Sequence, residues 1–243
     1  MPKNPLGKAT WRAAWYLLGY LLTGGFGFAA ALTAVTGAIG LAITLAGIPL
    51  LVAAASVIHG CAAFERFRLR VMFPERVLAR YRQPSRPGII AHATTRWKDP
   101  ATWREFAYLV GMYPPLLIMD CVVFTVWLTL LAGVTAPAWY RAPVEHYSNG
   151  LAVHGIQLGY FPNGPSGRGG HGLYLDTLPK ALLTAAICLI LVALFSYVLV
   201  ATARAHATVA RALLRPPEDP LARAKEVLER SGPLASHLSH NDI

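Results

Sequence analysis

The sequence predicts an all-α membrane protein: four transmembrane helices, arranged as two parallel-repeated hairpins, with a small β-containing extracytoplasmic loop. Hydrophobic residues make up 55% of the 243 residues and charged residues 14%, against about 25% charged residues in ordinary soluble domains. Four apolar segments exceed the roughly 20 residues that cross a bilayer core. Lysines and arginines gather in the segments that flank them. These three observations favour a membrane bundle over a soluble domain.

The predicted spans are residues 13–35, 38–62, 106–134 and 178–203. Only Thr36, Gly37 and their neighbours separate the first two spans, which predicts a tight helical hairpin. The second and fourth helices are expected to continue past the membrane as basic amphipathic extensions. Pro74 and Pro216 should stop these extensions.

A weak internal repeat relates the two halves of the chain. Trp11-Arg12 followed by residues 16–19 matches Trp103-Arg104 followed by residues 108–111. Both halves begin on the same side, so the repeat is expected to be parallel rather than inverted.

The positive charges predict the orientation. Nineteen of the 22 lysines and arginines lie before the first span, between the second and third spans, or after the fourth. The positive-inside rule therefore puts both termini in the cytoplasm and the loop at 136–177 outside the cell membrane. The predicted organisation is a cytoplasmic N-terminus at 1–12, a transmembrane domain at 13–215 and a cytoplasmic tail at 216–243. We expect the last dozen residues to be disordered.

The net charge of +10 indicates basic flanks next to anionic lipid. A nucleic-acid partner is not expected, since such a protein carries its charge on a soluble face. Five arginines would form basic collars at the inner surface and dock anionic lipid or a partner, or else only set the topology: Arg66, Arg68, Arg70, Arg204 and Arg211.

The external loop is long enough to have a function of its own. Residues 151–158 alternate as a strand would. His146, His154, His171 and Asp176 in this loop could ligate zinc or sense pH. Their spacing matches no tight metal motif, so ordinary polar loop residues are favoured and no metal or other cofactor is predicted.

Asp120 lies near the middle of the third predicted span. A carboxylate at that depth costs about 2.5–3.5 kcal/mol and needs a partner or a proton. It is either a proton- or ligand-responsive group, or a protonated acid bonded to a threonine, a tyrosine or a backbone carbonyl. Pro114-Pro115 and Pro49 are expected to bend their spans, as hinges or simply as packed bends.

Glycines are frequent in the first two spans and allow close helix contact. This pattern does not separate packing within one chain from a homodimer. The cysteines all lie in apolar segments, so neither a disulfide nor a cysteine metal site is expected.

Several segments, in this order and spacing, resemble the "putative sensor" domain found at the N-terminus of many actinobacterial two-component histidine kinases. The segments are 11–12 with 16–19, 47–51, 63–66, 99–104, 136–140 and 175–182, and the likeness covers about residues 10–214. The resemblance implies a membrane-embedded input module of a signalling protein. It implies no ligand and no catalytic residue.

One departure from those kinases affects the function. No phospho-acceptor histidine motif and no nucleotide-binding glycine box follow the domain, so we expect a stand-alone sensor or a fragment that is not an enzyme. The expected function is to pass an envelope or ligand signal to a histidine kinase or another cytoplasmic partner. The alternative is a transporter subunit or a small membrane enzyme acting on a lipid-soluble substrate, favoured by Asp120 and the prolines.

Overall fold

A computed structural model describes residues 6–41, 47–75, 77–79, 81–84, 87–147, 150–165, 167 and 170–216. The first five residues and the tail beyond Pro216 lie outside the described residues, and so do the predictions made for that tail.

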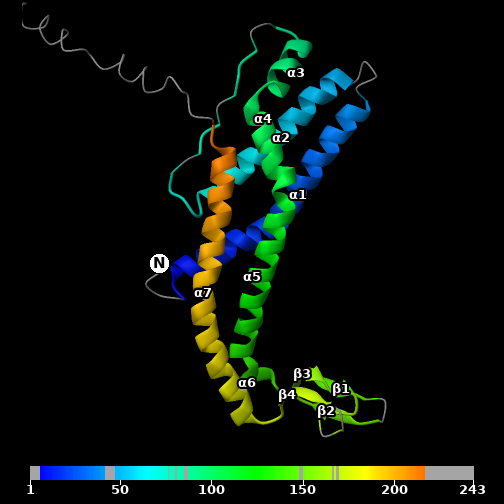
Figure 1. The fold of residues 1–243 in the computed structure, drawn as a ribbon, viewed down its shortest axis with the longest axis vertical. Helices are drawn as coiled ribbons and strands as arrows, with labels where there is room; N and C mark the ends of the chain where they lie inside the picture. The colour runs from blue at the N-terminus through cyan, green and yellow to red at the C-terminus, as the bar shows by residue number, and fades with distance from the viewer. Residues whose placement is uncertain are drawn as a thin grey trace, which may run out of the picture.

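Within the described residues, four helices are long and apolar enough to cross a membrane. They are α1 (Lys8–Gly40), α2 (Gly47–Leu69), α5 (Tyr113–Val134) and α7 (Leu178–Leu214). Each contains most of one predicted span. As predicted, α7 runs well beyond residue 203 and ends just before Pro216. Figure 1 shows α5 and α7 side by side along the long axis of the molecule.

The predicted turn at Thr36-Gly37 is wrong, because α1 continues to Gly40. The Thr36 hydroxyl donates to the carbonyl of Leu32 one turn earlier, at 2.8 Å, and so bonds within the helix. No proline interrupts this part of the chain.

The prolines do not bend the helices from within. Pro114 and Pro115 lie in the first turn of α5, and Pro49 lies in the first turn of α2. A first-turn proline lacks only an N–H that the helix leaves unpaired anyway. The predicted third span is instead interrupted before α5. Two short helices, α3 (Ile89–Trp97) and α4 (Pro100–Phe106), are followed by a π-helical turn, η1 (Ala107–Gly111), and α5 starts after this turn.

The two hairpins are not parallel in the structure. The Trp11 ring of α1 packs edge-on against Trp127 of α5, with centroids 5.5 Å apart, and Phe28 stacks on Tyr113 at 4.7 Å. Early residues of α1 thus meet late residues of α5, so these helices run in opposite directions. In Figure 1 the end of the α1–α2 hairpin lies toward α3, at the opposite end of the molecule from the strands.

The loop at 136–177 contains strands, as predicted. After α6 (Ala136–Trp139), β1 (Val144–His146) pairs antiparallel with β2 (Ala152–His154). β3 (Ile156–Tyr160) pairs antiparallel with β4 (His171–Leu175) in a separate two-stranded sheet.

The core lies where α1, α2, α5 and α7 meet, and it includes Leu17, Ile58, Trp127 and Leu199. Much of the outer surface of these helices is also apolar. Phe26 is 73% exposed, Ile118 65% and Ile190 63%. Side chains of this kind on three different helices are suited to an apolar solvent such as lipid.

Candidate functional site

Five polar side chains from four elements form a buried cluster, here called the Glu65 cluster. Its members are Glu65 and Arg68 of α2, Tyr108 of η1, Asp120 of α5 and His206 of α7, and each is at least nine-tenths buried. Arg68 Nη2 donates to Glu65 Oε2 at 2.7 Å, and Arg68 Nε donates to the same oxygen at 3.2 Å. Buried charges need such pairing, because desolvating a lone charge is costly.

Hydrogen bonds continue from this pair across the bundle. The Tyr108 hydroxyl donates to Glu65 Oε2 at 3.1 Å. Tyr108 Oη lies 3.4 Å from His206 Nε2, and His206 Nδ1 lies 2.6 Å from Asp120 Oδ2. Since Tyr108 gives its single proton to Glu65, Nε2 must donate to Tyr108. One proton then lies between His206 Nδ1 and Asp120 Oδ2, so every contact of the chain has a donor.

Two tyrosines of α1 close the Glu65 cluster. The Arg68 guanidinium lies over the ring of Tyr16, 4.4 Å from its centroid, and 4.8 Å from the centroid of Tyr20. The His206 ring packs edge-on against both tyrosines, at 5.3 and 4.3 Å. Rings in these positions exclude water and stabilise the desolvated cation by roughly 2 kcal/mol.

Two atoms in this region are buried without a hydrogen-bond partner among the described residues, Asp120 Oδ1 and the Tyr16 hydroxyl. One is an acceptor, the other can donate, and both belong to side chains that contact His206. Buried groups of this kind are normally satisfied, often by an internal water.

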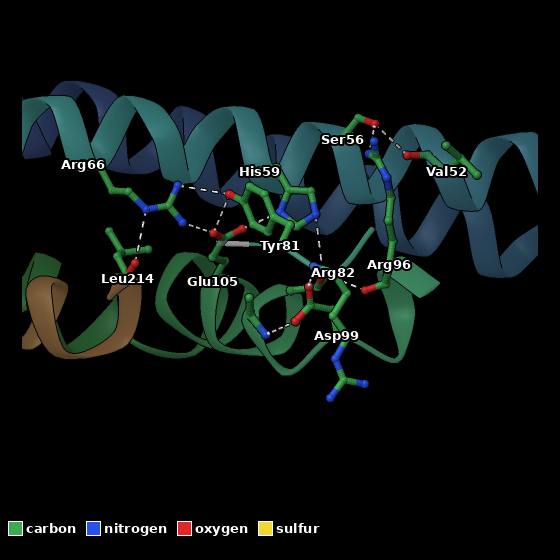
Figure 2. A network of polar contacts seen from close by, with 12 residues as sticks. Val52, Ser56, His59, Arg66, Tyr81, Arg82, Arg96, Asp99, Glu105 and Leu214 are labelled. Atoms are coloured by element: carbon green, nitrogen blue, oxygen red, sulfur yellow. Dashed lines mark hydrogen bonds and ion pairs between the residues drawn. The ribbon is translucent and has the colours of Figure 1, made fainter. Parts of the chain in front are cut away.

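A second buried cluster, here called the Glu105 cluster, is drawn in Figure 2. Glu105 of α4 is 1% exposed and is bound by three groups: His59 Nδ1 at 2.6 Å, the Tyr81 hydroxyl at 2.8 Å, and Arg66 Nη2. Burial, reinforced by the Glu105 carboxylate, raises the pKa of Tyr81 to about 12. The neutral phenol therefore stays a donor to Glu105 at physiological pH.

Arg66 joins this cluster to the end of α7. Its Nε donates to the carbonyl of Leu214, the last residue of that helix, at 3.2 Å, and its Nη1 contacts the Tyr81 hydroxyl at 3.1 Å. The final carbonyls of a helix have no partner within the helix, so a buried arginine there holds the end of α7 against α2.

Asp99 orders the segment that carries Tyr81. Its Oδ1 accepts from the Ala101 N–H at 3.0 Å as the N-cap of α4, and its Oδ2 accepts from the Arg82 N–H at 2.9 Å. The side chain thus fixes residues 81–84 against the start of α4, as Figure 2 shows.

The five arginines predicted to dock lipid or a partner differ in burial and in pairing. Arg66 and Arg68 are both 7% exposed and paired inside the protein, so neither is free for lipid, and that prediction is wrong for them. Arg211 pairs with Glu75. Arg70 and Arg204 are exposed, and the Arg70 guanidinium lies over the Phe67 ring.

The loop residues predicted as ligand or proton sensors do not converge. His146 pairs with Ala152 at one end of the β1–β2 ladder, His154 pairs with Val144 at the other, and His171 lies on β4. No group of three histidine, cysteine or carboxylate side chains that could hold a metal occurs in the described part of the chain. Asp176 accepts a hydrogen bond from Lys180 at 2.7 Å, which lowers the pKa of Asp176.

Asp120 is distant from the loop at 136–177. It lies in the first half of α5, 14 residues before Val134, which is roughly 20 Å along a helix. Its partner is a histidine, rather than a threonine, tyrosine or backbone carbonyl.

Sequence reasoning missed Glu65, Glu105 and His206 as site residues. A signal was available for the two glutamates: each acidic side chain stands where an apolar segment meets a group of arginines. Glu65 also precedes Arg68 by three residues, the spacing of a helical ion pair. His206 stands between two alanines, and nothing beside it indicates a partner.

Four helices of membrane-spanning length, with buried hydrogen bonds between α2, η1, α5 and α7, indicate a helical membrane protein with an internal polar network. The family model described as "Putative sensor" matches residues 16–214, and the chain belongs to this family. The predicted resemblance is thereby confirmed. No match was found among the curated proteins or among the solved structures.

Proposed function

We propose that the protein is a membrane-embedded sensor that passes an envelope or ligand signal to a cytoplasmic partner and has no catalytic activity of its own. Membership of the sensor family supports this role. The observation that carries it is the link from Glu105 through Arg66 to the carbonyl of Leu214, which couples α4 and α2 to the end of α7.

In this proposal α1, α2, α5 and α7 cross the membrane, with both termini in the cytoplasm. Arginine counts and helix contacts disagree on one point, the side on which the connection after Gly40 lies. The arginines require it outside, whereas the contacts of Trp11 and Phe28 direct it toward α3. The proposal assigns no side to Gly40 and rests the membrane crossing of α1 and α2 on charge: residues 13–64 contain no lysine, arginine or carboxylate. Apolar helices of that length are stable in lipid rather than in water.

Glu65, Arg68 and His206 stand at the helix ends that the arginines assign to the cytoplasm, and Tyr108 and Glu105 precede α5 on that side. A signal that moves α5 against α7 would strain the bond between Asp120 and His206. The bond between Arg66 and Leu214 would then carry the displacement to the cytoplasmic end of α7.

The proposal can be tested by complementing a deletion strain. We expect Arg66→Lys, which cannot bond Glu105, Tyr81 and Leu214 together, to fail to restore the transcript profile of the wild type. Arg70→Lys is the matched control. Arg70 lies four residues after Arg66, is exposed, and pairs with no carboxylate in the described structure.

Both variants must reach the membrane in equal amounts for this comparison. If Arg66→Lys restored the profile as fully as Arg70→Lys does, the proposed route through Arg66 would be wrong. If deleting the gene did not change the transcript profile under any envelope stress, the proposed sensor function would be wrong.

A further inference from the structure

A cavity of about 340 Å³ opens between α1 and α2, the two helices that lie side by side in Figure 1. Its volume lies in the range of small-molecule sites, about 300–1,000 Å³. Its walls are apolar at most positions. They are formed by Leu22, Thr23, Phe26, Gly27, Gly60, Cys61, Phe64, Glu65 and Leu109.

One oxygen of Glu65 is left short of donors at this cavity. Arg68 and Tyr108 both bind Oε2. Among the described residues, Oε1 is approached by Thr23 Oγ1 alone, at 3.3 Å. The Thr23 hydroxyl also lies 2.9 Å from the carbonyl of Gly19, and its single proton goes to the shorter bond. Glu65 is 3% exposed, so water does not readily replace the missing donor.

The missing donor should be neutral. The carboxylate of Glu65 is already balanced by Arg68, so an ammonium group at Oε1 would leave an uncompensated positive charge in an apolar cavity. A hydroxyl group supplies the proton without adding charge.

The cavity also determines what the rest of the ligand is. Leu22 and Phe26 are each 73% exposed and Phe64 is 51% exposed, so the mouth of the cavity continues into the apolar outer surface of α1 and α2. An alkyl or prenyl chain can lie along that surface while the head enters the cavity. The cavity of about 340 Å³ therefore has to admit only the head group and the first carbons of one chain.

We propose that this cavity binds a neutral single-chain lipid alcohol, whose hydroxyl donates to Glu65 Oε1. The inference rests on the proposed function only for the effect of binding. A bound hydroxyl would draw Glu65 away from Tyr108 and so alter the hydrogen bonds that reach His206 and Asp120.

The test measures binding alone, with the full chain in phosphatidylglycerol–phosphatidylethanolamine nanodiscs. Radiolabelled dodecan-1-ol is bound to immobilised protein, with empty nanodiscs subtracted, and dodecane and dodecylammonium serve as chain-matched competitors. A hydrogen bond to a charged acceptor predicts at least about tenfold tighter binding of the alcohol than of the alkane. Equal competition by dodecane, or tighter binding of dodecylammonium, would overturn the proposal.

The variant that blocks the site is Gly60→Leu. A Cβ at Gly60 meets nothing within 4 Å, so a leucine occupies the cavity without a clash, and a helix tolerates leucine better than glycine. Gly37→Leu is the matched control, because Gly37 of α1 is equally open but does not line the cavity.

We expect Gly60→Leu to lose dodecan-1-ol binding and Gly37→Leu to keep it. Equal binding by the two variants would overturn the site. This assay measures no signalling output. A negative result would therefore refute the lipid alcohol as ligand, while the proposed sensor function is tested separately by the complementation experiment.

Discussion

His206 of α7 and Asp120 of α5 lie 86 residues apart in the sequence and 2.6 Å apart between imidazole Nδ1 and carboxylate Oδ2, and both side chains are fully buried. This bond joins the two helices that lie closest along the bundle. It also ends a chain of hydrogen bonds that starts at Arg68 and passes through Glu65 and Tyr108.

The first prediction concerns the strength of this pair. Asp120→Ala and His206→Ala should each lower the free energy of unfolding by about 3–5 kcal/mol, because each leaves a buried polar partner behind. The double variant should lose about 1–3 kcal/mol less than the sum. Unfolding in mixed micelles with increasing SDS measures all four members of the cycle, and strict additivity would show that the two side chains do not interact.

The second prediction concerns the end of α7. Arg66→Lys removes the bond to the Leu214 carbonyl, so the last turn of α7 should open more often. Amide hydrogen exchange at residues 211–214 should speed up by roughly tenfold, the effect of losing about 1.4 kcal/mol. Arg70→Lys should leave that exchange unchanged. Equal exchange rates in both variants would show that Arg66 does not stabilise the last turn of α7.

The third prediction follows from the pKa of Tyr81. The folded pKa of about 12 exceeds the ordinary value of 10.0, so folding favours the neutral phenol. The stabilisation is complete below pH 10 and is lost as the pH rises from 10 to about 12. Ultraviolet titration of tyrosinate should show one group near pH 12 that is missing in Tyr81→Phe. Identical titration curves would contradict the burial of Tyr81 beside Glu105.

The fourth prediction concerns the loop histidines. Because His146, His154 and His171 do not converge, replacing all three with alanine should leave the heat of zinc titration unchanged. Calorimetry that showed zinc binding to the wild type and its loss in the triple variant would contradict the observed placement of these side chains.

The four long helices and the strands of the loop could be predicted from the sequence, because hydropathy and alternation are local properties. The end of α1 could not, since Thr36 bonds within the helix rather than ending it. The repeat relating Trp11-Arg12 to Trp103-Arg104 is also local. It records similar sequence and carries no information on which helix faces meet, so the parallel arrangement inferred from it does not appear in the structure.

The two clusters depend on long-range packing. Arg66 and Arg68 resemble the exposed arginines around them in the sequence. Arg66 is buried by Glu105 and the end of α7, and Arg68 by the tyrosines of α1, and these contacts are all long-range. Asp120 could be singled out because a carboxylate in an apolar segment is costly. Its partner could not, because His206 is 86 residues away, on another helix.

The most direct measurement is labelling of single cysteines with a membrane-impermeant maleimide, in a variant that lacks Cys61, Cys121 and Cys188. The account places both termini in the cytoplasm and the loop at 136–177 outside. A cysteine at His154 should therefore react in intact cells, and a cysteine at Thr208, exposed on α7, should react only after permeabilisation. Labelling of Thr208→Cys in intact cells, or protection of His154→Cys there, would contradict this arrangement.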